Sequence, residues 1–272
     1  MPVTTSLFDL TDKVALVSGG GTGIGKAIAA AFLQHGARVM IGGRRLDVIE
    51  QTVQELDALA LADSDEPNVA GVTLDVTKTE SVQRAVRKTV DVLGGVHIAV
   101  HAAGNFAKLP TFDLTTETMA DLYDTHVTGA LRLAQAAGHI FREQHDGCII
   151  NIASISSFMA LTEVTAYASA KSALLGLTRN LATEWARFGI RTNAIAPGFI
   201  PTDINRKAIV GTDRGRRIIE NTPMARFGTA DEIAGAAVYL AAPAASFVNG
   251  QTITVDGGFL ANGVGDATAD WD

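Results

Sequence analysis

Short apolar runs alternate with longer amphipathic stretches along nearly the whole chain. Each run is apolar at consecutive positions and too short for a helix, which is typical of a strand buried on both faces. Between the runs, apolar residues recur at the spacing of helices that cover a sheet. The pattern predicts strands at residues 14–18, 37–41, 69–74, 96–101, 148–152, 191–196 and 252–255, and helices near residues 24–35, 46–61, 79–93, 115–144, 165–187 and 230–241.

This alternation predicts an α/β fold, a doubly wound seven-stranded parallel sheet flanked by helices on both faces. No linker, repeat or low-complexity tract divides the 272 residues, so we expect one domain over residues 1–272. Residues 199–228 interrupt the alternation and are expected to form a lid over the substrate. Residues 263–272 are polar and acidic, which is typical of a flexible tail.

The first predicted strand leads into a glycine-rich turn over residues 19–25 and then directly into a helix. Glycines let the backbone approach a ligand closely, and a helix start offers free N–H groups and the positive end of its dipole. The turn therefore suits a diphosphate, although glycines also make ordinary turns. Ligands of such sheets bind beyond the carboxyl ends of the strands, where this sequence places glycine or polar residues.

A tyrosine and a lysine, Tyr167 and Lys171, stand four residues apart in a predicted helix and so share one face. An unperturbed tyrosine has a pKa of about 10, and a nearby ammonium favours the phenolate. Ser154 lies just past a predicted strand end, where its hydroxyl can hydrogen-bond a reacting oxygen. The alternative for the pair alone is a surface helix with a chance Tyr-xxx-Lys spacing.

Taken together, these landmarks resemble the short-chain dehydrogenase/reductase family, with 3-oxoacyl-ACP reductases as the similar subtype. The resemblance spans about residues 10–260 and implies a single Rossmann-fold domain. It also implies that Ser154 positions the carbonyl, Tyr167 exchanges the proton, and Lys171 holds the nicotinamide ribose. The implied cofactor-binding residues are Gly19, Gly21, Thr22, Gly23, Ile24, Gly25, Arg44, Arg45, Asp75, Val76, Ala103, Gly104, Tyr167, Lys171, Pro197, Gly198, Ile200 and Thr202.

Two histidines depart from the family pattern. His126 stands where the family has an asparagine that helps hold a proton-relaying water, so His126 is a fourth catalytic candidate. Histidine titrates near physiological pH, and a modified relay would give a pH–rate inflection near neutrality that disappears in His126→Asn. The alternatives are a weakened proton relay, or a histidine whose hydrogen bonds are satisfied inside the helix bundle. His101 stands where the family often has asparagine and is expected to be structural.

The cofactor preference rests on Arg44 and Arg45, which follow the second predicted strand, with no acidic residue before Asp47. A carboxylate there would accept from a ribose 2′-hydroxyl, whereas guanidiniums bind a 2′-phosphate. We therefore expect NADP(H), with NAD(H) less favoured. The alternative is that the arginines face solvent or pair with Asp47 or Glu50.

Composition and charge limit the kinds of partner and location that we expect. The net charge of −7 argues against general nucleic-acid binding. No apolar segment is long enough to span a bilayer, residues 1–6 do not resemble a signal peptide, and the one cysteine is expected in the core. We expect a cytoplasmic protein with no membrane association. No His, Cys, Asp and Glu cluster has metal-site spacing, so no metal is expected.

The predicted lid is basic: residues 201–227 carry six basic and three acidic side chains. A positive lid would steer an anionic small molecule, such as an acyl thioester of CoA or acyl carrier protein; a solvated helix face or subunit contact is the alternative. One interpretation of five further side chains is an apolar pocket, and the more common alternative is ordinary core packing: Phe106, Phe158, Met159, Leu161 and Phe199.

The favoured function is NADP(H)-dependent interconversion of a carbonyl and an alcohol, with 3-oxoacyl thioester reduction as the favoured subtype. Two alternatives stay open: a 2,4-dienoyl-CoA reductase-like enzyme and a catalytically weak NADP-binding regulator. The family resemblance also implies a homotetramer.

Overall fold

Seven parallel strands form one sheet in the order β3-β2-β1-β4-β5-β6-β7. The computed structural model describes residues 7–59, 67–203 and 205–263. The predicted tail therefore lies outside the described residues, apart from Gly263. The strands are β1 Val14–Ser18, β2 Arg38–Gly43, β3 Val69–Thr73, β4 Ile98–His101, β5 Gly147–Ile152, β6 Ile190–Pro197 and β7 Thr252–Val255.

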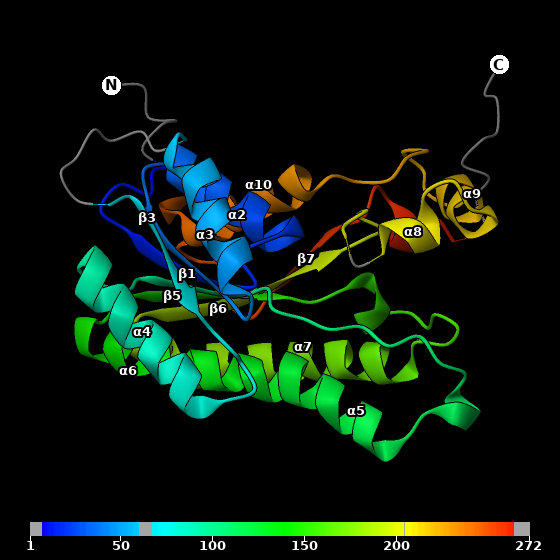
Figure 1. Ribbon diagram of the computed structural model, residues 1–272, viewed down its shortest axis with the longest axis horizontal. Helices are drawn as coiled ribbons and strands as arrows, with labels where there is room; N and C mark the ends of the chain where they lie inside the picture. Colours follow the sequence, from blue (N-terminus) through cyan, green and yellow to red (C-terminus); the bar gives the residue numbers. More distant parts are fainter. Residues whose placement is uncertain (1–6, 60–66, 204, 264–272) are drawn as a thin grey trace.

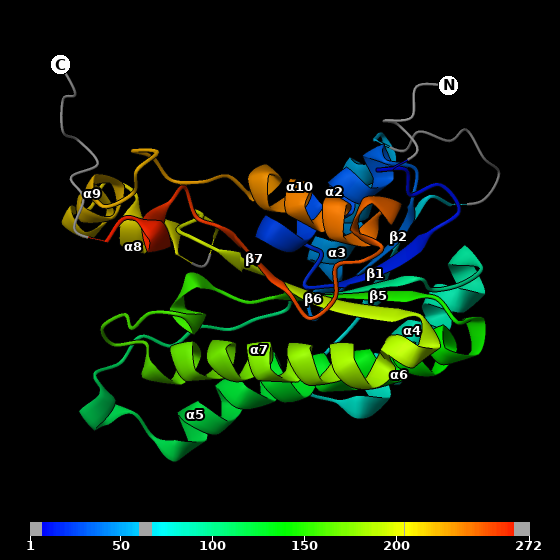
Figure 2. The same cartoon turned by 180° about the vertical axis from the view of Figure 1, so that it is seen from behind.

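Helices cover both faces of the sheet, as the alternation predicted. Figures 1 and 2 show α2, α3 and α10 on one face and α4, α6 and α7 on the other, with α8 and α9 beyond one end of the sheet. The α-helices are α2 Gly23–Gln34, α3 Leu46–Asp57, α4 Thr79–Leu93, α5 Thr116–Tyr123, α6 Gly129–Gln144, α7 Thr165–Trp185, α8 Arg206–Ile209, α9 Asp213–Glu220 and α10 Ala230–Ala241. Short 3-10 turns occupy Thr111–Asp113, Ile155–Ser157, Ala186–Phe188, Pro243–Ala245 and Phe259–Ala261.

The strand order reverses between β1 and β4, and this reversal positions the site. In register, Ser18 pairs with Gly42 of β2 on one side and with His101 of β4 on the other. The crossovers after these two strands leave in opposite directions along the sheet, which opens a crevice at their carboxyl ends. Segments distant in sequence therefore meet at one edge.

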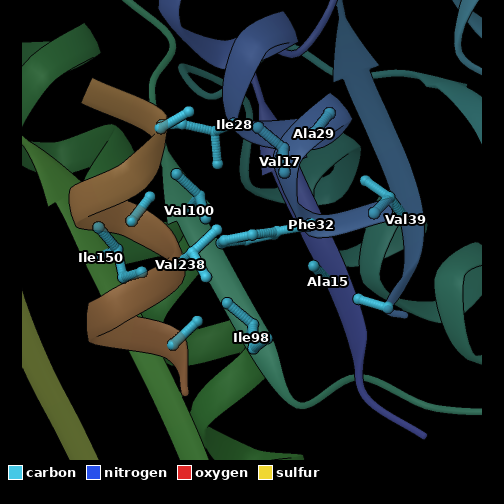
Figure 3. Close-up of a cluster of buried hydrophobic side chains, with 14 of the residues drawn as sticks. Ala15, Val17, Ile28, Ala29, Phe32, Val39, Ile98, Val100, Ile150 and Val238 are labelled. Carbon is cyan, nitrogen blue, oxygen red and sulfur yellow. The ribbon is translucent and has the colours of Figure 1, made fainter. Parts of the chain in front are cut away.

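The larger core lies between the sheet and the pair α2 and α10. On α2, Ile28, Ala29, Phe32 and Leu33 form one buried face. Figure 3 shows Phe32 pointing from α2 toward Val238 of α10 and the strand side chains beneath. A second core packs α4, α6 and α7 against the opposite face. The sheet is apolar on both sides because it is buried on both sides.

The structure corrects the predicted elements in three places. The predicted helix 115–144 contains a π turn over Asp124–Thr128 between α5 and α6. A π turn adds one residue to a helical turn, which an apolar periodicity averaged over thirty residues does not reveal. The lid segment contains two short helices, α8 and α9, and the helix predicted over residues 46–61 ends at Asp57.

Phe32→Ala should lower the free energy of unfolding by about 3–5 kcal/mol, because Phe32 is fully buried and truncation leaves a cavity. Chemical denaturation would measure the change, and Phe112→Ala is the control because Phe112 is fully exposed. Equal losses in the two variants would contradict the packing described.

Candidate active site

The glycine-rich turn lies at the strand reversal and fits a diphosphate. Gly19 has φ +72°, and a Cβ added there would lie 2.7 Å from the Ala103 nitrogen, so only glycine is unstrained. The Ser18 Oγ joins the two segments, because it donates to the Val100 carbonyl (3.1 Å) and accepts from the Ala103 N–H (3.4 Å). The first turn of α2 has no acidic residue and no side-chain cap from Thr22. Its N–H groups are therefore open to an anion.

A cavity of about 470 Å³ lies beside this turn and is lined by residues that follow β1, β2, β3 and β4. Arg44 and Arg45 both line it. Among the described residues, neither guanidinium forms an ion pair with Asp47 or Glu50. The two positive charges thus remain available to an anionic ligand.

Asp75 follows β3, lines the same cavity and is ionised. Burial by itself would raise the pKa of Asp75. Hydrogen bonds from the N–H and hydroxyl of Thr77 (3.0 and 2.7 Å) and the charges of Arg44 and Lys78 outweigh burial and hold the pKa below its usual value. A fixed carboxylate here can accept from an amino group, such as that of adenine.

A second cavity, of about 320 Å³, brings Ser154, Tyr167 and Lys171 together. Ser154 follows β5, and its Oγ accepts from the Ser156 N–H (3.2 Å). Tyr167 and Lys171 lie one turn apart on α7, with the Lys171 Nζ 5.6 Å from the centre of the Tyr167 ring. The Nζ also donates to the Ile152 carbonyl at 2.6 Å, which fixes the long side chain against β5.

Burial controls the titration of both groups on α7. It lowers the pKa of Lys171 to about 7, and it raises the pKa of Tyr167 despite the Ser154 hydrogen bond that favours the phenolate. For the protein's own groups, burial outweighs any stabilisation of the Tyr167 phenolate by the Lys171 ammonium. Desolvation of the phenolate is the larger effect.

His126 lies in the π turn and lines the Tyr167 cavity. Its Nε2 is 2.9 Å from the Asn105 carbonyl oxygen; because a carbonyl only accepts, Nε2 carries the proton and Nδ1 the lone pair. Nδ1 is buried and has no hydrogen-bond partner among the described residues. The His126 ring meets Tyr167 edge to face, with ring centres 5.3 Å apart. Burial and the charge of Lys171 lower the pKa of His126 to about 2. This direction is opposite to the expected titration of His126 near neutrality, which the pH–rate profile tests.

His101, the last residue of β4, lines neither cavity. Its Nδ1 lies 3.4 Å from the Ser18 Oγ, and burial together with the charge of Lys171 lowers its pKa to about 3. It packs behind the turn as a neutral side chain, in agreement with the structural role expected.

The lid carries its basic residues in different environments. Arg216 pairs with Asp213 (3.0 Å), and Arg226 pairs with Glu232 (2.6 Å). Among the six basic residues, only Arg214 lines the cavity of Tyr167. Of the positive lid predicted from the sequence, one arginine therefore lies at the wall of this cavity.

Part of the apolar lining was predicted and part was missed. Phe106, Leu161 and Phe199 line the cavity, whereas Phe158 and Met159 do not. Asn105 and Lys108 come shortly after Ala103 and Gly104 in the loop that follows β4. Their closeness in sequence to these two predicted site residues could have indicated them. The other lining residues that sequence analysis missed follow or end β4 and β5, or lie in the lid and in the approach to α7: Ala102, Ile152, Ala153, Ile155, Val164, Asp203, Asn205, Ala208 and Ile209.

The two cavities adjoin at the glycine-rich turn, since Gly19, Thr22, Ala103 and Gly104 line both. The predicted cofactor residues that line one or both are Gly19, Gly21, Thr22, Gly23, Ile24, Gly25, Arg44, Arg45, Asp75, Val76, Ala103, Gly104, Tyr167, Lys171, Pro197, Gly198, Ile200 and Thr202.

The described residues contain neither a cluster suited to a metal ion nor a helix suited to cross a membrane. In residues 7–59, 67–203 and 205–263, no group of three or more His, Cys, Asp or Glu side chains is arranged to hold a metal ion. Within those same ranges, no helix combines the length and apolar character needed to cross a membrane.

Comparison with known proteins places this arrangement in a family. A family model described as enoyl-(acyl carrier protein) reductase matches residues 19–260. The chain is 33% identical over 255 residues to 2-dehydro-3-deoxy-D-gluconate 5-dehydrogenase of Dickeya dadantii, covering 93% of this chain and 98% of that protein.

Solved structures agree. A gluconate 5-dehydrogenase from Burkholderia cenocepacia, crystallised with NADP and tartrate, is 30% identical with a TM-score of 0.88 and covers 95% of this chain and 99% of its own. A short-chain type dehydrogenase/reductase from Mycobacterium marinum is 32% identical with a TM-score of 0.86, covering 93% and 98%. The chain therefore belongs to the short-chain dehydrogenase/reductase family of NAD(P)-dependent oxidoreductases.

Proposed function

We propose that this protein is an NADP(H)-dependent oxidoreductase that interconverts a secondary alcohol and a ketone on a small hydroxylated molecule. The observation that carries the proposal is the convergence of Ser154, Tyr167 and Lys171 in a cavity that adjoins the diphosphate turn. When bound, the nicotinamide cofactor supplies or accepts the hydride. The protein supplies the proton and the orientation.

The chemistry follows from the three side chains. The Ser154 hydroxyl holds the reacting oxygen, and the buried Tyr167 hydroxyl gives its proton to that oxygen during ketone reduction and takes it back during alcohol oxidation. Lys171 is fixed by the Ile152 carbonyl, and its charge beside Tyr167 favours the phenolate when the oxygen loses its proton. A bound nicotinamide cation adds to this electrostatic support for the phenolate.

The proposed preference for NADP(H) rests on Arg44 and Arg45 at the cavity beyond β2. The relative from Burkholderia was crystallised with NADP, which supports the same preference. Gly21 and Thr22 complete the phosphate side, and Asp75 faces the adenine side of the proposed complex.

Reduction of 3-oxoacyl thioesters is a second candidate. The apolar side chains of Phe106, Leu161 and Phe199 in the Tyr167 cavity favour it. The relatives with sugar-acid names favour small hydroxylated substrates instead. A substrate panel separates the two.

We further propose that residues 199–228 act as the substrate lid of one domain over residues 1–272, and that the protein is cytoplasmic and assembles as a homotetramer. The long helices α6 and α7 on one face of the sheet support the assembly (Figure 2). Light scattering that gives the mass of a single 28.4 kDa chain would overturn the tetramer.

Tyr167→Phe should lower kcat by about 10²–10⁴-fold while leaving NADPH affinity nearly unchanged, because it removes only the proton donor. NADPH oxidation would be followed with small ketones, 3-oxoacyl thioesters and 2,4-dienoyl-CoA, and NADP⁺ reduction with polyols and hydroxy acids. Turnover of dienoyl-CoA alone would support the reductase alternative. Tight NADPH binding with no turnover on any compound, in wild type and variant alike, would support the regulator.

Replacing Arg44 and Arg45 together by Gln should weaken NADPH binding about 10- to 100-fold and leave NADH binding nearly unchanged, because hydrogen bonds to a charged group contribute about 1.5–3 kcal/mol. Fluorescence titration would measure both affinities. The control is Arg84→Gln, since Arg84 is exposed on α4 and lines neither cavity. Parallel losses for NADPH and NADH would refute the 2′-phosphate role.

We propose that His126 orients the site as a neutral side chain, because its Nε2–H is committed to the Asn105 carbonyl and its Nδ1 can only accept. His126→Asn should keep kcat within about tenfold, since an amide also donates and accepts, while His126→Leu should lower kcat about 10- to 100-fold by leaving a buried carbonyl unpaired. The pH profile of kcat/KM between pH 5 and 9 should keep its shape in His126→Asn. A neutral-pH inflection that vanishes in this variant would restore the titrating relay.

A further inference from the structure

Three cationic side chains line the cavity that contains Tyr167, and two of them are already engaged. The Lys108 Nζ lies 2.8 Å from a carboxylate oxygen of Glu163. The Lys171 Nζ donates to the Ile152 carbonyl. Among the described residues, Arg214 forms no ion pair. The cavity wall thus contains one guanidinium whose charge is not matched by the protein.

The local fold holds Arg214 at this wall. Arg214 is the second residue of α9, and the helix start is fixed because the Thr212 Oγ1 accepts from the Gly215 N–H (3.0 Å). A Cβ on Gly215 would collide with the Ile209 carbonyl, so α9 packs directly on the end of α8. The carboxylate of Asp213, the nearest acid on α9, is taken by Arg216.

The surroundings of Arg214 strengthen its attraction for an anion. Arg214 is half-buried, and Leu161, Val164, Phe199 and Ile209 line the same cavity, where charges interact more strongly than in open water. One acidic side chain, Asp203, also lines the cavity, but it is exposed and forms no ion pair with Arg214. Planar guanidinium matches a carboxylate with two parallel hydrogen bonds.

We propose that Arg214 binds a carboxylate of the substrate itself, so that the enzyme acts on short hydroxy acids and oxo acids rather than on neutral polyols or acyl thioesters. The inference rests on the proposed function, because it places the reacting carbon at Ser154 and Tyr167 in the same cavity. The anion and the reacting carbon must then fit together in one cavity of about 320 Å³. In an acyl thioester the long pantetheine arm separates the reacting carbonyl from the phosphates, so the thioester does not meet this condition.

The test compares acids with neutral compounds of the same carbon skeleton: D-gluconate with D-glucitol, tartrate with threitol, and 3-hydroxybutyrate with 1,3-butanediol. Calorimetry on the NADP⁺-loaded protein measures affinity, and NADP⁺ reduction measures KM and kcat. At least one acid should bind at least about tenfold more tightly than its neutral counterpart. Arg214→Gln should abolish that difference, raising KM for the acid about 10- to 100-fold with a smaller change in kcat.

The matched control is Lys207→Gln, which removes one positive charge from an exposed position on α8 outside both cavities. It should leave the acid preference unchanged. Equal losses in Lys207→Gln and Arg214→Gln would overturn a specific anchor in favour of general steering by the lid. Arg214→Lys should restore part of the preference, because the charge returns without the planar fork.

The two proposals fail in different ways. Turnover of neutral polyols or thioesters with no preference for any acid would overturn the Arg214 assignment and leave the oxidoreductase function intact. Arg214-dependent binding of an acid without turnover would overturn the oxidoreductase function and leave the anion site intact. Absence of binding by all three acids would overturn the anchor outright.

Discussion

The close approach of two backbone segments at the reversal of strand order is the constraint on which the site depends. Gly19 follows β1 with a positive φ and lies against the Ala103 backbone, which follows β4. A side chain at Gly19 would separate these segments and block the ligand side of the crevice. Because both cavities share residues of this turn, one contact positions the two cavities relative to each other.

Desolvation is the second governing effect, and it acts on three titratable side chains that lie close to one another. One cavity is lined by Lys171, Tyr167 and His126. Burial lowers the pKa of Lys171 and His126 and raises that of Tyr167, so it favours the neutral form of each side chain. Burial therefore opposes a net charge on each of the three groups. This gives a bound charged cofactor or substrate strong influence over the titration of Tyr167.

Positive charge is divided between the two ends of the combined cavity. Arg44 and Arg45 lie at the end beyond β2, where no described acid pairs with them, and Arg214 lies at the other end on α9. Arginines that pair with nearby carboxylates, such as Arg216 and Arg226, stabilise the lid and its junction with α10. Their ion pairs distinguish these two arginines from Arg44, Arg45 and Arg214, which form none with the described residues.

The sequence by itself determined the sheet and its covering helices, and it indicated many of the residues that line the two cavities. These features depend on local rules: buried strands are continuously apolar, glycines permit the turn, and the carboxyl ends of parallel strands share an edge. The same rules predicted that Ser154 follows a strand and that Tyr167 and Lys171 share one helical turn, as the structure has them.

Only the tertiary structure decided the rest, because those properties depend on neighbours distant in sequence. The π turn at His126 does not alter the apolar periodicity enough to be seen, and burial beside Lys171 determines its pKa. The selection of Arg214 among six basic lid residues depends on how α9 packs on α8. Residue type and spacing specify which chemistry is present, whereas packing determines which groups are desolvated, paired or free to bind a ligand.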